Sequence, residues 1–556
     1  MDEFRNFIYE IIDNDLKENP NLKIHTRFPP EPNGYLHLGS AKAMMINYDI
    51  SKKYGGTFNL RYDDTNPTKE DTEYVESIYR DLVWLLGEEP SGGVFYGSDY
   101  FDLCFEYAVK LIKDGKAYVC DLSKEDVIEY KGTDRSEGSR VSPYRDRSVE
   151  ENLDLFYRMK NGEFPEGART LRAKIDPNSP NTYLRDPIIY RIKYASHHRQ
   201  GNKWCIYPMY DFAHPIQDAT EGITHSLCSL EFENHRPLYE WVVNNIGLTN
   251  EFKPKQREFA RINVTYTTVS KRYLRQLVEG GIVDGWDDPR LPTLYALRRR
   301  GFTPSSIMSF VRNAGVSKSD NLVDIRMLEA CLRDELNESA PRRVCVLHPI
   351  KVIIDNLPDG FEENFDLPNH PQHPEMGTRT VKFTKELYID ADDFALEPPP
   401  KFFRMKKDGE VRLMGAYIVK CNDVLLNDDG SVKELHCTAD LESGNGNPID
   451  GRKIKGTIHW LSAKYAFDTT VMLYDRLFTL EDLAEAETDE NGNALYNNYL
   501  NPDSLIKVEH AKVEPSLADA KLDERFQFVR TGYFCKDSRY ENTFNRIVSL
   551  KDSFKA

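Results

Sequence analysis

The chain has 556 residues, of which 40% are hydrophobic and 29% are charged. This composition supports large folded cores and excludes wholesale disorder, and the length predicts about three to five domains. Asp and Glu (90) outnumber Lys and Arg (73), so the net charge is −17 and a uniformly basic nucleic-acid-binding protein is excluded. A local basic surface is not excluded, because binding depends on where charge lies. From Lys253 to Arg343 the balance reverses, with 17 basic and 11 acidic residues.

The nine cysteines are scattered, with no CxxC pair and no cluster of His and Cys at metal-ligand spacing. Reduced thiols in a cytoplasmic protein fit this pattern better than a disulfide framework, and we expect no structural zinc or other protein-bound metal. The N-terminal residues have the spacing of an amphipathic helix, not of a signal peptide. Because no apolar run reaches 18 residues, we expect no membrane partner.

The first hundred residues predict strands that alternate with helices. A strand over 24–28 ends at two prolines, and a helix over 40–54 ends at two glycines, which are strong stop signals. A second strand over 58–62 precedes a helix over 75–85. Strands separated by helices form parallel sheets, so we expect an α/β fold built on a Rossmann-like, doubly wound domain.

The pattern then loosens between residues 100 and 202, and a strand-like run resumes at 204–211. Residues 265–340 read as helical, including a helix over 322–336, and the remainder carries short alternating runs typical of antiparallel β-barrels. We therefore expect four parts: a Rossmann-like domain in two halves (1–99 and 203–264), an inserted domain (100–202), a helical subdomain (265–340) and two β-barrel domains (341–556).

The segment FPPEPNGYLHLGS, from Phe28 to Ser40, joins the first strand to the first helix. Ligands of open parallel sheets bind at such strand ends. His37 stands at the start of the helix, where free N–H groups and the helix dipole favour a phosphate, and Gly34 and Gly39 let a ligand approach the backbone closely. The competing interpretation is a proline-bracketed turn with Ser40 as a cap.

A second segment, VSKR at 269–272, follows Arg261. Alone it is typical of a surface loop. Combined with the first segment it adds a fixed cation to neutral donors, which suits a displacement at the α-phosphate of ATP. The charge on that centre and on departing pyrophosphate is stabilised by positioned donors.

These two segments resemble the HIGH and KMSKS signatures of class I aminoacyl-tRNA synthetases, and the residues around them resemble the glutaminyl-tRNA synthetase family. Further runs carry the resemblance along nearly the whole chain: LRYDDTNP (60–67), YPMYDFAH (207–214), EGITHSLCSLEF (221–232), GTIHW (456–460), LYDRLF (473–478) and GYFCKDS (532–538). The family implies that glutamine and ATP, with Mg²⁺, form a glutaminyl-adenylate. Glutamine then passes to the terminal adenosine of its tRNA, and AMP and pyrophosphate are released. It also implies a monomer.

The resemblance assigns residues to each ligand. The catalytic residues would be His37, Ser40 and Lys271. The ATP site would comprise Glu31, Pro32, Asn33, His37, Leu38, Gly39, Ser40, Ala41, Lys42, Ala43, Ser229, Arg261, Ile262, Val269, Ser270 and Lys271. Glutamine would contact Asp63, Tyr210, Cys228 and Gln256. A carboxylate at Asp63 can pair with the substrate ammonium; the competing interpretation of Asp63 and Asp64 is a strand-end turn with a helix cap.

The choice between glutamine and glutamate depends on Cys228. Related glutamyl enzymes look to carry an Arg at this place, and a buried glutamate carboxylate without a countercharge is costly. Cys228 therefore favours glutamine, unless it is simply a core thiol. A glutamyl-tRNA or dual-specificity synthetase remains the first alternative.

Ser40 departs from the signature, which usually ends in a second His. A hydroxyl can donate to a phosphate but carries no charge, so a catalytically weak tRNA-binding protein is the second alternative. We expect activity to survive, because His37, Lys271 and the backbone N–H groups remain.

The partner tRNA must be held at both ends. The inserted domain would hold the acceptor end, near which Asn234 replaces a frequent Asp. The barrels would read unstacked anticodon bases, with Arg342, Arg404 and Arg412 at positions that the family uses; Met414 replaces another basic residue expected there. We expect the basic stretch from Lys253 to Arg343 to follow the inside of the L-shaped tRNA.

Overall fold

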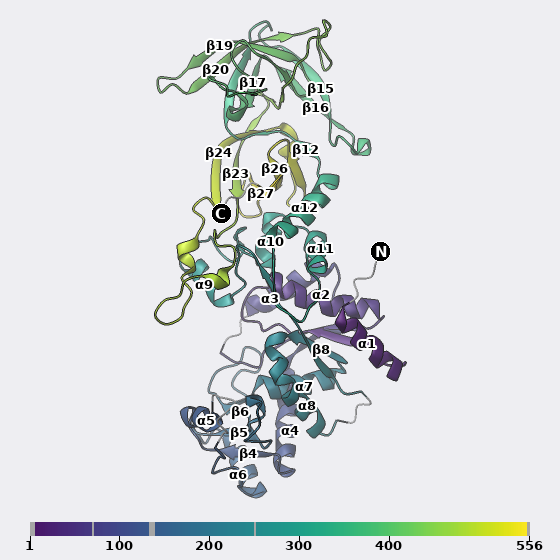
Figure 1. Cartoon of the computed structure of the whole chain (residues 1–556), viewed down its shortest axis with the longest axis vertical. Coiled ribbons are helices and arrows are strands. Elements are labelled where there is room, and N and C mark those ends of the chain that lie inside the picture. Colours follow the sequence, from purple (N-terminus) through teal and green to yellow (C-terminus); the bar gives the residue numbers. More distant parts are fainter. Residues whose placement is uncertain (1–5, 69–71, 133–139, 249–251, 553–556) are drawn as a thin grey trace.

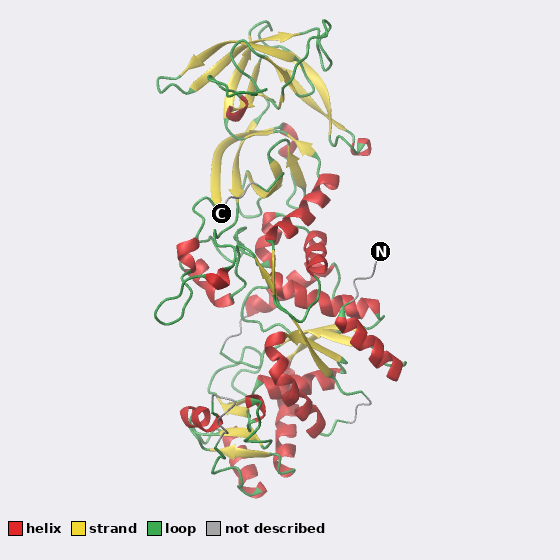
Figure 2. Cartoon of the chain, in the orientation of Figure 1, coloured by secondary structure: helices red, strands yellow, loops and turns green. Residues whose placement is uncertain are grey.

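The computed structural model describes residues 6–68, 72–132, 140–248 and 252–552. The molecule is elongated, and its parts follow one another along the long axis (Figure 1). Helices and a small sheet form one end, a parallel sheet with helices lies near the middle, and two strand-rich domains form the other end (Figure 2). Within the described residues, no helix is both long and apolar enough to cross a membrane.

Three parallel strands in the order β1-β2-β3 form the first half of the parallel-sheet domain. Helix α2 joins β1 to β2, and α3 joins β2 to β3. All residues of β2 after Thr57 are buried, as expected for a strand covered on both faces. The predicted doubly wound arrangement is confirmed. Its elements are α1 (Phe7–Glu18), β1 (His25–Phe28), α2 (Leu38–Lys53), β2 (Thr57–Tyr62), α3 (Thr72–Leu86) and β3 (Gly93–Tyr96).

A second parallel pair, β8 and β9, lies beside β1. The contact is direct, because the amide of Thr224 donates to the carbonyl of His25 at 2.9 Å. The carboxyl ends of β1 and β8 therefore face the same edge of the domain, where the predicted ligand-binding segments begin. The elements of this half are α7 (Tyr210–Glu221), β8 (His225–Ser229), α8 (Arg236–Asn245), β9 (Lys255–Phe259) and β10 (Ile262–Val264).

The inserted region contains a four-stranded antiparallel sheet in the order β4-β5-β6-β7. Its last strand was expected to resume the parallel sheet. Instead β7 pairs with β6, with Ile206 of β7 opposite Ile192 of β6. The run at 204–211 therefore completes the inserted sheet before α7 returns to the parallel one. The elements are α4 (Phe101–Lys113), β4 (Ala117–Cys120), α5 (Lys124–Lys131), α6 (Val149–Lys160), β5 (Thr170–Ala173), β6 (Ile188–Ile192) and β7 (Ile206–Pro208).

The helical subdomain contains α9 (Lys271–Glu279), α10 (Leu294–Arg300), α11 (Pro304–Ala314) and α12 (Ile325–Ser339). The expected helix over 322–336 begins later than predicted, because β11 (Asn321–Val323) pairs in parallel with β10. Asp324 separates the two elements, and its carboxylate accepts from the amide of Arg326 at 2.9 Å as the cap of α12. A capping side chain at this position explains the late start of the helix.

One seven-stranded sheet forms the first strand-rich domain, in the order β12-β25-β26-β27-β23-β24-β13. Its two edge strands, β12 and β13, are separated in the chain only by Val344, so the sheet must curl until its edges meet. The result is the predicted barrel, although β12 with β25 and β23 with β27 pair in parallel. The strands are β12 (Arg342–Arg343), β13 (Cys345–Val346), β23 (Phe467–Tyr474), β24 (Leu505–Val513), β25 (Arg525–Phe528), β26 (Gly532–Lys536) and β27 (Thr543–Ser549).

The second barrel-like domain is inserted between β13 and β23 of the first. Its sheet has the order β21-β18-β19-β20-β14-β17-β22, and the hairpin β15–β16 extends from it. The edge strands β21 and β22 are again close in the chain. The strands are β14 (Pro349–Ile354), β15 (Glu362–Pro368), β16 (Thr378–Thr384), β17 (Glu386–Asp390), β18 (Glu410–Leu413), β19 (Ile418–Leu426), β20 (Val432–Asp440), β21 (Thr457–Ile458) and β22 (Leu461–Ser462). We call it the distal barrel and its neighbour the proximal barrel.

A continuous hydrophobic core joins the parallel sheet to the proximal barrel. It includes Phe58 and Leu60 of β2, Leu328 of α12, and Ile547 of β27. Burial of such large apolar surface fixes the proximal barrel against the helices. The fold thereby sets the position of the proximal barrel relative to the parallel sheet.

Candidate active site and RNA-binding surfaces

His37 caps the N-terminus of α2. Its Nδ1 accepts hydrogen bonds from the amides of Gly39 and Ser40 at 3.1 and 3.3 Å. Burial and the nearby cations Lys271 and Arg261 lower the pKa of His37 to about 3, so the ring is neutral. Since Nδ1 accepts, the ring proton lies on Nε2, which is left as a donor for a ligand.

Ser40 completes a capping box with His37. The amide of His37 points to Ser40 Oγ at 3.4 Å, while His37 Nδ1 accepts from the amide of Ser40. The hydroxyl that replaces the second signature His is thus part of the helix cap. Substitution of Ser40 would change the geometry of the helix end as well as a donor.

Lys271 is the first residue of α9, and its side chain reaches the first signature segment. Its Nζ donates to Asn33 Oδ1 at 2.5 Å, and a Cβ on Gly34 would lie 3.4 Å from Lys271 Cδ. Burial lowers the pKa of Lys271, while Glu31 opposes this effect. Two segments that are far apart in the sequence therefore meet at the start of α2.

The other predicted ATP-site residues differ in what their side chains can reach. Leu38, Ala41 and Ile262 belong to the hydrophobic core, so they can offer a ligand only their backbone. Ser229 Oγ donates to Glu231 Oε1 at 2.7 Å, and Arg261 pairs with the same carboxylate. Glu31, Arg261 and Ser270 are exposed, Pro32 and Lys42 are buried, and Asn33, Gly39, Ala43 and Val269 are half-buried.

Asp63 lies at the end of β2, next to the first signature segment. Its amide donates to the carbonyl of Pro30 at 2.9 Å, and Thr65 Oγ1 donates to its carboxylate at 2.8 Å. Burial, together with the charge of Glu31, raises the pKa of Asp63 to about 7. A carboxylate held in this state gains strongly from a cationic ligand.

Tyr210 begins α7, with its ring 4.9 Å from that of His214 and 5.3 Å from that of Phe232. Burial raises the pKa of Tyr210, and the nearby Cys228 and Asp63 add to the shift. Its hydroxyl is therefore protonated and can donate. The structure thus brings Asp63, Tyr210 and Cys228 into one neighbourhood.

Cys228 adds no positive charge to the group that it forms with Asp63 and Tyr210. Burial and the charge of Glu258 raise the pKa of Cys228. Gln256 Nε2 donates to Glu258 Oε1 at 2.9 Å and to the carbonyl of Phe232 at 3.0 Å. Glu258 in turn accepts from Arg236 Nε at 3.0 and 3.1 Å, so the cation beside Glu258 is already paired.

Behind Tyr210 lies a buried charged network that sequence reasoning missed. Arg27 Nε donates to Asp218 at 3.1 Å, and Arg27 Nη2 donates to Ser226 Oγ at 2.6 Å and contacts His214 Nε2 at 2.9 Å. Arg61 donates to the same Asp218 at 2.6 Å. Arg27, Arg61 and Asp218 are fully buried. An arginine within each of the two buried strands β1 and β2 was a signal of this network, because arginine is almost never fully buried unless it is paired.

One group of described residues could hold a metal ion by proximity alone: Asp64, His197 and His198. His197 does not fit this role. Its Nε2 donates to the carbonyl of Asp64 at 2.7 Å, and its Nδ1 accepts from the amides of Arg199 and Gln200 at 3.1 and 3.2 Å. With both nitrogens engaged, the group offers a metal ion too few ligands and acts as a hydrogen-bonded link to the inserted domain.

The four residues predicted to bind RNA lie in separate places. Asn234 is exposed, and its carbonyl accepts from Asn181 Nδ2 of the inserted region at 2.8 Å. Arg342 is buried and donates to the carbonyls of Ala340 and Asn337 at 2.7 and 3.0 Å. Arg404 is exposed and donates to the carbonyl of Asp392 at 2.7 Å, and Arg412 donates to the carbonyl of Gly446. Arg342 is thus the least accessible of the three arginines.

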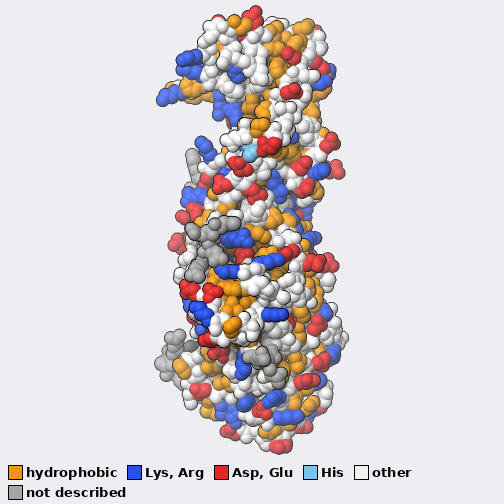
Figure 3. Space-filling view, turned by 90° about the vertical axis from the view of Figure 1, so that its right-hand side faces the viewer, with side chains coloured by type: hydrophobic (Ala, Val, Ile, Leu, Met, Phe, Trp, Pro, Cys, Tyr) orange, Lys and Arg blue, Asp and Glu red, His pale blue; other side chains and the backbone are white. Residues whose placement is uncertain are grey.

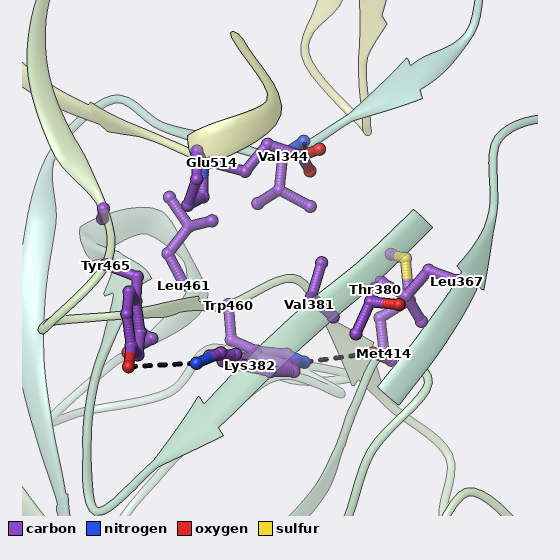
Figure 4. A pocket seen from close by; sticks show the side chains of 13 residues that line it. Val344, Leu367, Thr380, Val381, Lys382, Met414, Trp460, Leu461, Tyr465 and Glu514 are labelled. Atoms are coloured by element: carbon purple, nitrogen blue, oxygen red, sulfur yellow. Dashed lines mark hydrogen bonds between the residues drawn. The ribbon is translucent and has the colours of Figure 1, made fainter. Parts of the chain in front are cut away.

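Met414 lines a cavity of about 190 Å³ between the two barrels. Figure 4 shows its side chain beside Thr380 and Leu367, with Trp460 and Lys382 nearby. Trp460 Nε1 donates to the carbonyl of Met414 at 3.0 Å, and Lys382 Nζ donates to Tyr465 Oη at 3.2 Å. An apolar side chain suits this cavity, which explains how Met414 replaces the expected basic residue.

The basic stretch from Lys253 to Arg343 is not a simple basic surface. Many of its cations form ion pairs with acids elsewhere in the chain, including Arg298 with Asp81 at 3.2 Å, Arg299 with Asp537 at 3.1 Å and Arg312 with Asp49 at 2.9 Å. On the face drawn in Figure 3, basic and acidic side chains are interspersed along the molecule. The excess positive charge of the stretch from Lys253 to Arg343 is therefore partly neutralised by contacts with other parts of the chain.

Comparison with known proteins agrees with this geometry. Residues 23–338 match the family model "tRNA synthetases class I (E and Q), catalytic domain", and residues 340–440 and 457–537 match two models described as the anti-codon binding domain of the same synthetases. The chain is 51% identical over 554 residues to a glutamine–tRNA ligase of Clostridium kluyveri, covering 99% of this chain and 98% of that protein.

It is also 53% identical over 555 residues to a glutamine–tRNA ligase of Yersinia pestis, with the same coverage. A solved glutamate-tRNA synthetase of Elizabethkingia anophelis is more distant, at 18% identity and a TM-score of 0.43, covering 57% of this chain and 72% of that one. With family models and full-length relatives in agreement, the chain belongs to the class I tRNA synthetases of the E and Q group, enzymes that use ATP.

Proposed function

We propose that the chain attaches L-glutamine to its cognate tRNA. In the first step, the carboxylate of glutamine attacks the α-phosphate of ATP, and the bond to pyrophosphate breaks. In the second, a ribose hydroxyl of the terminal adenosine attacks the carbonyl carbon, and AMP leaves with the bonding electron pair. The family match and the full-length relatives named glutamine–tRNA ligase support this function.

The contact of Lys271 with Asn33 carries the proposal. It joins the fixed cation of the second signature to the helix N-terminus of the first. His37 Nε2–H, the Lys271 ammonium and the free amides at the start of α2 then form one set of donors. These donors suit negative charge that builds up at the α-phosphate and on pyrophosphate. Mg²⁺ enters as part of the ATP substrate, since it binds chiefly through phosphate oxygens.

Glutamine is proposed to bind between Asp63 and Tyr210. The Asp63 carboxylate pairs with the ammonium group, and the Tyr210 hydroxyl donates to an oxygen of the amide. Around the side-chain amide stand the neutral thiol of Cys228 and Gln256, with Glu258 close behind. A glutamate carboxylate would be repelled by Glu258, whose partner Arg236 is already engaged, and this favours glutamine.

The tRNA is proposed to span the length of the molecule. The inserted domain would hold its acceptor end near Asn234, and the barrels would bind its anticodon, with Arg404 and Arg412 offering donors at the surface. Arg342 would have to exchange its intramolecular bonds for RNA contacts. We further propose that the protein acts in the cytoplasm and as a monomer. A single chain suffices because it carries the proposed sites for ATP, glutamine and tRNA.

Amino-acid-dependent ATP–pyrophosphate exchange, run with tRNA present, tests this function. Glutamine should support exchange and should then appear on the tRNA. Equal exchange with glutamate would contradict glutamine specificity. Binding of tRNA without exchange, with exchange restored by Ser40→His, would instead indicate a catalytically weak tRNA-binding protein.

A further inference from the structure

Two cysteines of the distal barrel, Cys421 and Cys437, face each other across neighbouring strands. They are direct register partners in the antiparallel pair β19–β20. Both side chains are fully buried and belong to the core of the distal barrel. The pair is remote from the proposed active site, and the proposed function does not use it.

The backbone hydrogen bonds define which kind of antiparallel pair this is. The amide of Cys421 donates to Gly409, and its carbonyl accepts from Asp408, at 3.2 and 2.7 Å. The carbonyl of Cys437 accepts from Asp355 at 2.8 Å. Both cysteines thus direct their backbone groups away from each other, so they form a non-hydrogen-bonded pair.

Side chains are closest in such a pair. Its Cα atoms typically lie about 4.5 Å apart, within the range of about 4.4–6.8 Å that a disulfide spans. Each thiol has the other as the largest influence on its pKa, as expected for neighbouring sulfur atoms. A bond between the sulfur atoms therefore needs rotation of the side chains and little movement of the backbone.

The surroundings of Cys421 favour its reaction over that of an ordinary buried thiol. The register of β19 and β20 shifts directly after it, where Asn422 is the extra residue. Beyond this bulge most residues of β19 are exposed, and few buried contacts hold such a segment closed. Local opening at the bulge would admit a small oxidant to the pair.

Cys421 is also the better nucleophile of the two. The neighbouring Cys437 thiol, helped by the charge of Lys407, lowers the pKa of Cys421 against the effect of burial. The neighbouring Cys421 thiol and, after it, burial raise the pKa of Cys437. Thiolates and not thiols react with peroxide, which gives the two cysteines different roles.

We propose that Cys421 and Cys437 form a reversible oxidation site that hydrogen peroxide converts to a cross-strand disulfide. The Cys421 thiolate attacks one peroxide oxygen, the O–O bond breaks, hydroxide leaves, and a sulfenic acid forms. Cys437 then loses its proton, attacks the sulfenic sulfur and displaces hydroxide, which takes up that proton as water. Overall, two thiols and one peroxide give one disulfide and two waters.

The disulfide would fix the root of the β19–β20 hairpin. It would close the loop between the two cysteines and constrain the unfolded chain, so the oxidised protein should unfold at a higher temperature than the reduced one. A thiol donor such as dithiothreitol should reverse both the bond and the shift.

Peptide mapping of the intact protein after peroxide treatment tests the site. Remaining thiols are alkylated, and the protein is digested without reductant. The expected product links the peptides of Cys421 and Cys437 and is about 2 Da lighter than their sum, through loss of two hydrogens. Cys345, buried in the proximal barrel, serves as the unpaired control and should stay alkylated.

Cys421→Ala and Cys437→Ala are the matched variants, and each should lose the cross-link and the peroxide-dependent rise in unfolding temperature. The proposal is overturned if both cysteines stay alkylated at a peroxide concentration that oxidises the half-buried Cys331. It is equally overturned if Cys421 and Cys437 become sulfinic acids without a linked peptide. The mapping of the unsubstituted protein decides the question even if a variant fails to fold.

Discussion

Lys271 and Asn33 are separated by 238 positions in the chain and are joined by a hydrogen bond of 2.5 Å. The bond ties the start of α9 to the loop before α2. In the proposed reaction, the same ammonium group that Asn33 holds would turn to the phosphates of ATP. The structure thus places the Lys271 ammonium group beside the N-terminus of α2.

Lys271→Ala should lower the rate of glutamine-dependent ATP–pyrophosphate exchange by about 10²–10³-fold, the usual loss for one donor to transition-state charge. The matched control is Arg272→Ala, because Arg272 contacts Asn493 at 3.0 Å and lies next to Lys271 in the chain. Steady-state kinetics should show a fall in kcat for Lys271→Ala. A similar loss in both variants would contradict the role of Lys271.

Ser40→Ala should leave exchange within about tenfold of the original rate, since the amides of α2 and His37 remain as donors. It should also reduce the free energy of unfolding by about 0.5–1 kcal/mol, through loss of the capping box. Urea unfolding and exchange assays measure the two effects separately. A drop in exchange as large as that of Lys271→Ala would assign Ser40 a direct part in catalysis.

The efficiency of glutamine use should rise with pH through about 7. Burial raises the pKa of Asp63 to about 7, and the ammonium group of glutamine needs the carboxylate form. The measurement is kcat/KM for glutamine between pH 5.5 and 8.5, with ATP and tRNA saturating. A flat profile would show that Asp63 is already ionised below this range.

The same residue makes a prediction about stability. A carboxyl group whose pKa is raised on folding holds its proton more tightly in the folded state, so its effect on stability becomes less favourable as pH rises from about 4 to 7. Asp63→Asn should therefore unfold at a higher temperature than the original protein at pH 8, and at a similar one near pH 4. Glutamine binding should be lost at both.

Asp218→Asn should destabilise the protein by about 3–5 kcal/mol, because it leaves Arg27 buried without a countercharge and leaves Arg61 with Glu221 alone. Burial alone would raise the pKa of Asp218, yet Arg27, His214 and Arg61 hold it well below the ordinary value. The stabilising charge is thus present at neutral pH and lost only in strong acid. Denaturant unfolding checks the size of the effect.

The control for Asp218→Asn is Asp49→Asn. Asp49 pairs with the partly exposed Arg312 at 2.9 Å, and exposed pairs contribute only about 0–1 kcal/mol. Equal losses of stability in the two variants would contradict the importance of the buried network.

Cys228→Arg should reduce kcat/KM for glutamine by about 10–100-fold and shift preference toward glutamate, because it places a cation where a side-chain carboxylate would lie. The new charge would also approach Glu258, so part of the gain for glutamate would be lost to that pair. Cys228→Ser keeps the site neutral and serves as the control. Unchanged discrimination in Cys228→Arg would place the specificity elsewhere.

Some elements of the fold follow from local sequence signals, and others depend on pairing between distant segments. The turn at Gly55 and Gly56 and the alternation in β2 were local signals, and both elements formed where expected. The strand at 321–323 could not be predicted from the sequence, because it pairs with β10, and the paired residues are 59 positions apart in the chain. The expected end of the inserted domain at residue 202 was wrong for a similar reason. Strand β7 has only three residues, and the sheet that it joins is decided by its pairing with β6 in space.

The sequence by itself determined the parallel-sheet domain, the barrels and the two signature segments, because these depend on local periodicity, turn residues and short motifs. Only the tertiary structure decided which charges meet. It placed Lys271 on Asn33, buried Arg27 and Arg61 around Asp218, and paired many cations of the stretch from Lys253 to Arg343 with distant acids. Electrostatic energy depends on distance in space, so a count of charges along the chain cannot foretell it.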